Sequence, residues 1–313
     1  MRKNTGIIAV TLLALLSGQT FAASNTIQVK GSDTLINVVQ RLAEVYMQKT
    51  PGASIAVTGG GSGTGIAALV NKKCDIANSS RGIKSSEVDQ ANAKGIDPKR
   101  VVVAIDALSI VVNRQNPVDR LKVDQIGAIY RGEITNWSQV GGSNSPIALY
   151  GRQSNSGTYD FMKENVMKGE YVSTLKSMNG NAQIVEAIKQ DVSGIGYVGV
   201  GYAKDVSADI KILEVALTDT IGYYSPINAL DVKSGKYPIT RPLNQYIAGT
   251  PGGQIKDFIE FELSKEGQDI IEQDGFFAIP EEYQRYNDQV LGRSSLRDRG
   301  AIAASVNDPL KSD

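Results

Sequence analysis

Short runs rich in β-branched residues alternate along the chain with longer segments in which apolar side chains recur every three or four residues, as Leu35, Val38 and Leu42 do. Strands that alternate with amphipathic helices are typical of α/β domains, in which helices cover a central sheet. We therefore predict an α/β fold. The strand-to-helix units are expected at residues 26–30 and 34–49, 54–58 and 62–71, and 147–150 and about 157–167.

All three units join strand to helix through the pattern Ser-x-Thr. The junctions are Gly-Ser-Asp-Thr at 31–34, Gly-Ser-Gly-Thr at 61–64 and Asn-Ser-Gly-Thr at 155–158. Serine and threonine are favoured N-caps whatever the function of a helix, so simple capping is one explanation. A helix start also offers unpaired N–H groups and a partial positive charge, which bind anions. Three such junctions, with the glycines at 59–61, favour an anion site.

Two arginines could supply charge to that site. Arg152 lies four residues before Ser156, and Arg81 follows Ser80 in a second hydroxyl-rich segment. Guanidinium groups suit tetrahedral oxyanions because their planar fork donates two hydrogen bonds at once. The glycine-rich stretch at 59–65 does not match a nucleotide motif, since no lysine follows it as a P-loop requires.

Composition excludes several classes of function. The chain has no histidine, so Ser-His-Asp triads, His-ligated zinc and histidine general bases are unavailable. We expect no metal and no cofactor. Hydrophobic residues make up 41% of the chain, which suits a globular body without long apolar spans. Cys74 is the only cysteine; no internal disulfide can form, and its flanks predict a buried strand residue.

The first residues have the pattern of a secretory signal peptide. Arg2 and Lys3 precede an apolar run at residues 6–16 and small residues at 20–23, with cleavage expected after Ala22 or Ala23. We expect residues 1–22 to be removed, leaving a periplasmic protein that does not insert into the membrane. Its net charge would be about −2, which gives no electrostatic footprint for nucleic acid or anionic lipid.

Over residues 27–279 the chain resembles the phosphate-binding proteins of bacterial phosphate ABC transporters. The resemblance is carried by Gly-Ser-Asp-Thr at 31–34, Gly-Gly-Gly-Ser-Gly-Thr-Gly at 59–65, Asp-Ile-Ala-Asn-Ser-Ser-Arg at 75–81, Tyr-Arg-Gly-Glu-Ile-Thr-Asn-Trp at 130–137 and Arg-Gln-Ser-Asn-Ser-Gly-Thr at 152–158. It implies inorganic phosphate as ligand and permease subunits as partners. The implied phosphate ligands are Thr34, the backbone of Leu35, Ser62, Ser80, Arg81, Arg152, Ser156, Gly157 and Thr158.

Ser80 departs from the family pattern. The family's well-known members have an aspartate there, which accepts the proton of hydrogen phosphate and repels sulfate. In this chain the acceptor would be a serine oxygen, a backbone carbonyl or Asp33. The departure leaves oxyanion binding intact but leaves the basis of phosphate selectivity open.

The resemblance also implies the two-lobed type II periplasmic binding protein architecture and a monomer. Lobe one would comprise residues 24–106 and 223–290, and lobe two residues 107–222. Residues 291–313 would form either a mobile tail or a strap over lobe one. Closure of the lobes around phosphate would be recognised by a permease. Two alternatives stay open: a periplasmic phosphatase or phosphoryl-transfer enzyme with Ser62 or Ser156 as nucleophile, and an extracellular adhesion or matrix protein that has kept the fold.

Overall fold

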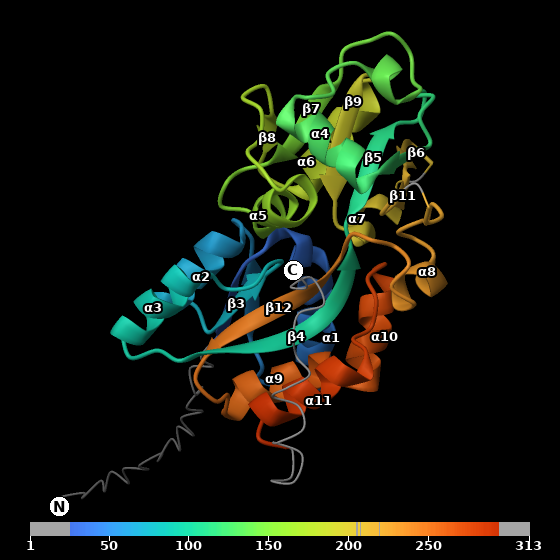
Figure 1. Ribbon diagram of the computed structural model, residues 1–313. Helices are drawn as coiled ribbons and strands as arrows, with labels where there is room; N and C mark the ends of the chain where they lie inside the picture. The colour runs from blue at the N-terminus through green and yellow to red at the C-terminus, as the bar shows by residue number, and fades with distance from the viewer. Residues whose placement is uncertain (1–25, 205, 207, 219, 294–313) are drawn as a thin grey trace, which may run out of the picture.

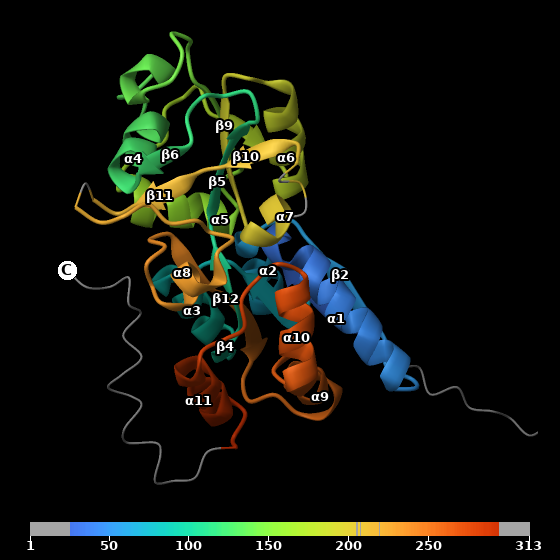
Figure 2. The ribbon, with the colours of Figure 1, turned by 90° about the vertical axis from the view of Figure 1, so that its right-hand side faces the viewer.

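The computed structural model describes residues 26–204, 206, 208–218 and 220–293. It confirms the predicted α/β fold, which is divided into two bodies, each a sheet flanked by helices (Figures 1 and 2). The predicted signal peptide and residues 294–313 of the predicted tail lie outside the described residues. Within the described ranges, no helix combines the length and apolar content that crossing a membrane requires.

Lobe one, the lower body in Figure 1, is built on a five-stranded sheet in the order β2-β1-β3-β12-β4. Its strands are β1 (Ile27–Gly31), β2 (Ile55–Thr58), β3 (Ile76–Ser79), β4 (Pro98–Ala107) and β12 (Thr240–Ala248). β1 is parallel to β2 and β3, whereas β12 is antiparallel to β3 and β4. The helices of lobe one are α1 (Ile36–Lys49), α2 (Ser62–Val70), α3 (Ser85–Ala93), α9 (Gly253–Glu262), α10 (Lys265–Gln273) and α11 (Glu281–Val290).

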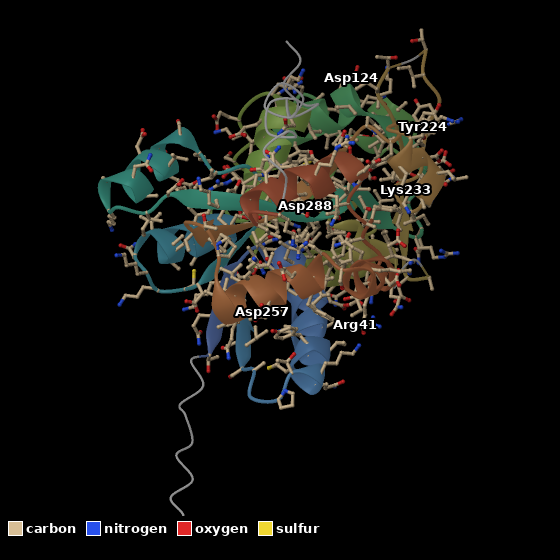
Figure 3. The ribbon with its side chains drawn as sticks, turned by 90° about the horizontal axis from the view of Figure 1, so that it is seen from below. Arg41, Asp124, Tyr224, Lys233, Asp257 and Asp288 are labelled. Carbon is tan, nitrogen blue, oxygen red and sulfur yellow. The ribbon has the colours of Figure 1, made fainter. Side chains whose placement is uncertain are left out.

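The helices of lobe one bury their apolar stripes and expose their charges. Val38, Val39 and Leu42 of α1 are fully buried, as the helical spacing predicts. Seen from below, Arg41 of α1 and Asp257 of α9 lie on the outside of the helical layer, and both side chains are exposed (Figure 3). The apolar faces therefore pack inward and hold the helices on the sheet.

Lobe two, the upper body, has a five-stranded sheet in the order β10-β5-β9-β7-β8 and a small β11-β6 ribbon. Its strands are β5 (Ser109–Asn113), β6 (Arg120–Lys122), β7 (Ala148–Arg152), β8 (Lys176–Met178), β9 (Gly194–Val198), β10 (Ile210–Ile212) and β11 (Glu214–Ala216). Its helices are α4 (Val123–Arg131), α5 (Gly157–Phe161), a π-helical segment (Met162–Met167), α6 (Asn181–Gln190) and α7 (Val200–Lys204). β7 is parallel to both β8 and β9.

Parallel strands fix where the helices begin. In lobe one, α1 and α2 follow the carboxyl ends of the parallel strands β1 and β2, while in lobe two α5 and α7 follow those of β7 and β9. The carboxyl edge of such a sheet is where ligands bind in open α/β folds. In this protein the two edges face each other, and the contacts described below join them.

Two chain segments connect the lobes. Leu108 separates β4 from β5, and the return path runs from Tyr224, which pairs with Val215, through α8 (Ala229–Lys233) to β12. The two segments are bonded to each other: the Leu108 amide donates to the Ile239 carbonyl at 2.9 Å, and the Tyr237 hydroxyl donates to the Leu108 carbonyl at 2.7 Å. Leu108 and Tyr237 are buried, so this hinge is part of the packed core.

The structure changes three local predictions. The first helix begins as a 3₁₀ turn at Asp33–Leu35, and the third divides into α5 and the π-helical segment. Cys74 is buried as predicted, but the prediction that it lies in a strand is wrong. It precedes β3 in a turn in which Lys72 has a φ of +55°, a conformation that interrupts an extended strand.

Candidate anion-binding site

Four hydroxyl groups from separate segments meet between the lobes. The Thr34 Oγ1 and Thr158 Oγ1 atoms are 3.2 Å apart, Ser80 Oγ lies 3.5 Å from Thr158 Oγ1, and Ser62 Oγ lies 3.4 Å from Ser80 Oγ. We call these four residues the hydroxyl cluster. All are buried, and each lies at or just after a helix start or strand end, as the Ser-x-Thr pattern predicted for three of them.

Gly157 allows the two lobes to approach this closely. A Cβ at Gly157 would lie 2.3 Å from Ser62 Oγ and 2.8 Å from Ser80 Oγ, which is closer than a Cβ approaches a non-bonded oxygen. The first residue of α5 therefore has to be glycine for the start of that helix to contact lobe one. Ser156, just before it, caps the helix by accepting a hydrogen bond from the Thr158 amide at 3.2 Å.

Arg152 lies at the carboxyl end of β7 and is almost completely buried. Its Nη2 donates to the Asp33 carboxylate of lobe one and to the Asn179 carbonyl at 2.9 Å. Its Nε and Nη1 are buried without any hydrogen-bond partner in the described part of the chain. An unpaired buried donor costs about 1–3 kcal/mol, more when it is charged. An oxyanion could accept from both nitrogens, so the residues present fit such a ligand.

Asp33 supports this arrangement from lobe one. Its Oδ1 accepts a hydrogen bond from the Gly60 amide at 2.8 Å, while its Oδ2 holds Arg152. The Leu35 amide, which the resemblance assigns to phosphate, donates to the Ser32 carbonyl at 3.1 Å within the 3₁₀ turn. The Asp33–Arg152 pair therefore fixes the guanidinium, whereas the Leu35 amide already has a partner.

Arg81 has partners other than those expected of an anion ligand. Its Nη1 and Nη2 donate to the two carboxylate oxygens of Glu87 at 2.8 and 2.7 Å, and its Nε donates to Asp160 of α5 at 2.9 Å. Burial works against the charged guanidinium, but Glu87 and then Asp160 outweigh it and raise the pKa of Arg81. Every nitrogen of the guanidinium is thus engaged, and the Asp160 bond joins lobe one to lobe two.

Two residues that sequence reasoning missed lie beside the hydroxyl cluster. Arg241 of β12 donates to Thr158 Oγ1 at 3.0 Å and to the Ser80 carbonyl at 3.1 Å, and it forms a buried ion pair with Asp106 of β4. Neither residue belongs to a recognisable motif. The sequence signal for these two residues is a charged side chain within each of two apolar strands. That signal does not show that the two side chains pair with each other.

Hydrogen bonds of Asn155 also join the two lobes. The Gly63 amide donates to the Asn155 carbonyl at 3.0 Å, and the Asn155 Nδ2 donates to the Gly60 carbonyl at 2.9 Å. Gly61, between them, has a φ of +88°, and a Cβ there would lie 2.6 Å from the Asn155 carbonyl oxygen. The glycine-rich segment therefore lets the loop before α5 pack directly against the start of α2.

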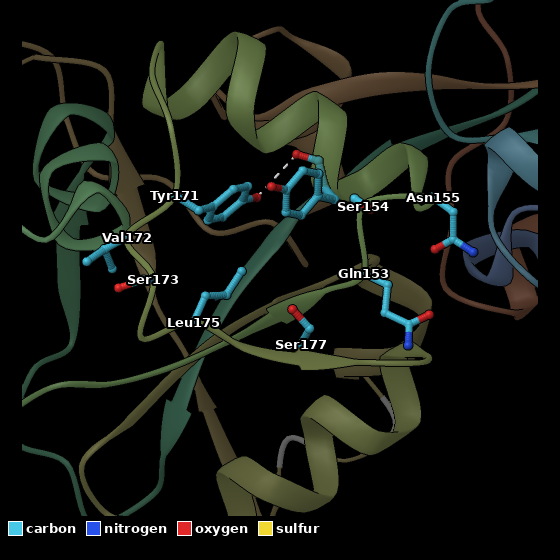
Figure 4. A pocket seen from close by; sticks show the side chains of 9 residues that line it. Gln153, Ser154, Asn155, Tyr171, Val172, Ser173, Leu175 and Ser177 are labelled. Carbon is cyan, nitrogen blue, oxygen red and sulfur yellow. Dashed lines mark hydrogen bonds between the residues drawn. The ribbon is translucent and has the colours of Figure 1, made fainter.

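A polar cavity of about 520 Å³ adjoins the loop between β7 and α5. Figure 4 shows Gln153, Asn155 and Tyr171 in its lining. The ring of Tyr171 stacks on that of Tyr159 at 4.3 Å, and its hydroxyl lies 2.9 Å from the Tyr197 hydroxyl, which accepts from the Arg152 amide. Burial raises the pKa of Tyr197 to about 12. Tyr171 in the lining is therefore linked through Tyr197 to the backbone of Arg152.

A second cavity, of about 870 Å³, lies on the side of the hinge and includes Leu217, Tyr237 and Phe277 in its lining.

Among the described residues, no group of His, Cys, Asp and Glu side chains could hold a metal ion.

Comparison with known proteins agrees with this geometry. Residues 18–266 match the family model described as a PBP superfamily domain. The chain is 30% identical over 275 residues to the phosphate-binding protein PstS of Pseudomonas aeruginosa, covering 82% of this chain and 84% of that protein. It is 31% identical over 257 residues to PstS of Staphylococcus aureus, covering 80% of this chain and 77% of that protein.

Solved structures give the same result. A crystal structure from Clostridium perfringens, described as a phosphate ABC transporter substrate-binding protein with bound phosphate, matches with a TM-score of 0.72 and 28% identity, over 82% of this chain and 100% of that one. An ABC-type phosphate transport receptor from Vibrio cholerae matches with a TM-score of 0.65 and 29% identity, over 81% of this chain and 100% of that one. The chain therefore belongs to the PBP superfamily and, within it, to the family of PstS phosphate-binding proteins.

Proposed function

We propose that this protein binds inorganic phosphate with high affinity and delivers it to the permease of a phosphate ABC transporter. The observation that carries the proposal is the pair of buried, unpartnered donors on Arg152 beside the hydroxyl cluster. Phosphate supplies the acceptors that these donors lack. The family relationship to PstS proteins supports the same ligand.

The proposed phosphate ligands are the hydroxyl cluster, Arg152 and the start of α5 at Ser156–Thr158. Ser156 contributes by capping that helix, and Gly157 by the space it leaves. Leu35 would contribute only if its amide left the Ser32 carbonyl. Arg81 acts instead as a contact between the closed lobes, because each of its three nitrogens already donates to Glu87 or Asp160.

The surroundings of the two candidate nucleophiles, Ser62 and Ser156, favour ligand binding over catalysis. Ser62 Oγ accepts from the Ser80 amide at 3.1 Å and lies against another hydroxyl, and Ser156 Oγ accepts from the Thr158 amide. A serine nucleophile needs an adjacent general base or metal, and the contacts of these hydroxyls supply neither. We therefore propose a binding protein rather than a phosphatase.

The proposal includes movement of the lobes about the hinge at Leu108 and Tyr237. Residues 24–106 with 223–290 would move against residues 107–222, and the structure corresponds to the closed arrangement. The closed form would present both lobes to the permease. The signal-peptide pattern supports export to the periplasm, with cleavage near Ala22. The proposed form of the exported protein is a monomer.

Calorimetric titration tests the proposal. The full chain is stripped of bound anion by unfolding and refolding, then titrated with phosphate, arsenate, sulfate and molybdate. Phosphate is expected to bind most tightly, to raise the melting temperature in proportion to the logarithm of its concentration, and to reduce the radius seen by small-angle scattering. No heat with phosphate, together with an unchanged melting temperature, would refute the function.

A further inference from the structure

The hinge strands bear an ion pair that touches the proposed phosphate site. Arg241 and Asp106 are directly opposite each other in the antiparallel β12–β4 register, close to where the chain crosses between lobes. The Nε and Nη2 of Arg241 lie 3.0 and 2.8 Å from Asp106 Oδ2, and both side chains are almost completely buried. Cross-strand partners of opposite charge hold each other's geometry.

This pair also contacts lobe two. Arg241 Nη2 donates to Thr158 Oγ1 at 3.0 Å, and its guanidinium carbon lies 5.2 Å from the centre of the Phe161 ring. Asp106 Oδ1 accepts a hydrogen bond from the Val200 amide, at the start of α7, at 2.9 Å. Within lobe one, Arg241 Nη1 donates to the Ser80 carbonyl at 3.1 Å. Arg241 therefore touches two residues of the hydroxyl cluster.

The bond to Thr158 determines how that hydroxyl is used. A guanidinium only donates, so Thr158 Oγ1 has to accept from Arg241, and its single proton is directed elsewhere. The neighbouring acceptors are Thr34 Oγ1 at 3.2 Å, Ser80 Oγ at 3.5 Å and any anion held between them. We propose, building on the phosphate-binding function above, that Arg241 is a positioning residue that sets the Thr158 hydroxyl as a donor to phosphate.

The proposal has a consequence for the protonation state of the ligand. With Thr158 fixed as a donor, the cluster has one fewer hydroxyl that can accept a hydrogen bond from a protonated oxygen of phosphate. The dihydrogen form, which has two protons to donate, is then disfavoured relative to the hydrogen phosphate dianion. Burial lowers the pKa of Arg241, and the Asp106 carboxylate opposes that effect, so the pair helps to keep the guanidinium charged.

A double-mutant cycle tests the link through Thr158. Arg241→Gln is expected to weaken phosphate binding about 10- to 100-fold, the usual effect of a charged hydrogen bond. In the Thr158→Val background the same change should weaken binding less than about threefold, because the hydroxyl that Arg241 positions is gone. Arg100→Gln is the control: Arg100 lies on the same sheet and donates to Asn244 Oδ1 at 2.7 Å; its loss should leave affinity unchanged.

Arg241→Gln leaves Asp106 buried without its partner and could unfold the protein. Asp106→Asn combined with Arg241→Gln removes both charges and keeps a polar side chain at each position. This double variant is expected to lose affinity like Arg241→Gln, whereas Asp106→Asn alone, which retains the Arg241 bond to Thr158, should lose less than about threefold. Melting curves establish that each variant is folded.

The pH dependence of phosphate affinity distinguishes a positioning role of Arg241 from a purely structural role, which would leave that dependence unchanged. The affinity of the wild type for phosphate should rise as pH passes through the second ionisation of phosphate, and this rise should flatten in folded Arg241 variants. The proposal would be overturned if Arg241→Gln reduced phosphate affinity equally in the wild type and in Thr158→Val. An unchanged pH dependence of affinity in the Arg241 variants would also overturn it. A wild type that does not bind phosphate at all would instead refute the proposed function, before any variant is measured.

Discussion

Asp33 and Arg152 form a buried ion pair that joins the two lobes, since Asp33 follows β1 of lobe one and Arg152 ends β7 of lobe two. Asp33 occupies Nη2 and leaves Nε and Nη1 of Arg152 without partners. The pair therefore holds the guanidinium in a fixed orientation in the closed form. A preorganised donor binds an anion without the cost of ordering its side chain.

Arg152→Ala is expected to weaken phosphate binding more than truncation of any other side chain in the site. Loss of a buried charged hydrogen-bonding group costs roughly 2–5 kcal/mol, about 30- to 5,000-fold in affinity. Calorimetry on the stripped protein measures the change. Arg285→Ala is the matched control, because Arg285 is exposed and pairs along α11 with Glu281. Affinity within about twofold of the wild type would show that Arg152 does not hold the ligand.

Asp160→Asn is expected to weaken closure of the lobes. It removes the negative charge of lobe two with which Arg81 and Lys84 of lobe one pair. We expect phosphate affinity to fall about 5- to 30-fold, because the lost bond to a charged group forms only when the lobes meet. The preference for phosphate over sulfate should not change, since Asp160 does not contact the hydroxyl cluster in the structure.

Glu87→Gln is the matched control for Asp160→Asn. It also neutralises a carboxylate bonded to Arg81, but Glu87 belongs to α3 of lobe one and its bond does not cross between the lobes. Small-angle scattering at subsaturating phosphate should show a larger radius for Asp160→Asn than for Glu87→Gln. Equal radii and equal affinities would contradict the assignment of Arg81 as a contact between lobes.

The sequence predicted the alternation of strands and helices because apolar spacing alone determines which face of each segment is buried. It also predicted the junctions at Ser32, Ser62 and Ser156, since their residue types are suited to helix starts. These local rules placed three of the four cluster hydroxyls, Thr34, Ser62 and Thr158, in or next to a junction. Ser80 required the family resemblance, because it follows β3 outside any Ser-x-Thr junction.

The rest of the site depends on contacts between distant segments. Arg241 and Asp106 are 135 positions apart and meet only because β12 inserts between β3 and β4. The position of Arg81 beside Ser80 suggests a phosphate ligand, but Arg81 donates to Asp160, which is 79 positions away and cannot be identified as a partner from local sequence. Local pattern identifies residue types suited to anions; it cannot show which nitrogens of an arginine already have carboxylate partners.

Glu262→Gln is expected to stabilise the protein at neutral and alkaline pH. Glu262 of α9 is buried against Gln245, and burial raises its pKa to about 8. Because this pKa exceeds its value in the unfolded chain, the folded protein binds the extra proton, and stability falls as pH rises from about 4.5 to 8. The loss is on the order of 3–5 kcal/mol above that range.

Thermal denaturation at pH 4 and pH 8 checks this expectation. Glu262→Gln should raise the melting temperature at pH 8 and change it little at pH 4, where the native carboxyl is already neutral. The glutamine amide can also donate to Gln245 Oε1, which is buried without a partner in the described residues. Glu44→Gln, at an exposed position of α1, should change the melting temperature at neither pH. An equal shift at both pH values would exclude titration of Glu262 as the cause.

Ser80→Asp is expected to widen the preference for phosphate over sulfate. A serine hydroxyl can donate or accept, whereas an ionised aspartate only accepts, so the aspartate would take the proton of hydrogen phosphate and repel sulfate. In this protein Ser80 lies between two hydroxyls, with Arg241 on its carbonyl, and no carboxylate contacts its side chain in the structure. The wild type should therefore prefer phosphate by a narrower margin than the variant.

Competition titrations of phosphate-loaded wild type and Ser80→Asp with sulfate measure the two margins. Ser80→Asn is the control, because its amide has a similar size to the new carboxylate but carries no charge to repel sulfate. The control should leave the margin near that of the wild type. If the wild type already excludes sulfate at a thousandfold excess, and Ser80→Asp changes nothing, the acceptor must be a group already present. Asp33 would then be the first candidate, since its carboxylate shares the Arg152 guanidinium with the proposed ligand.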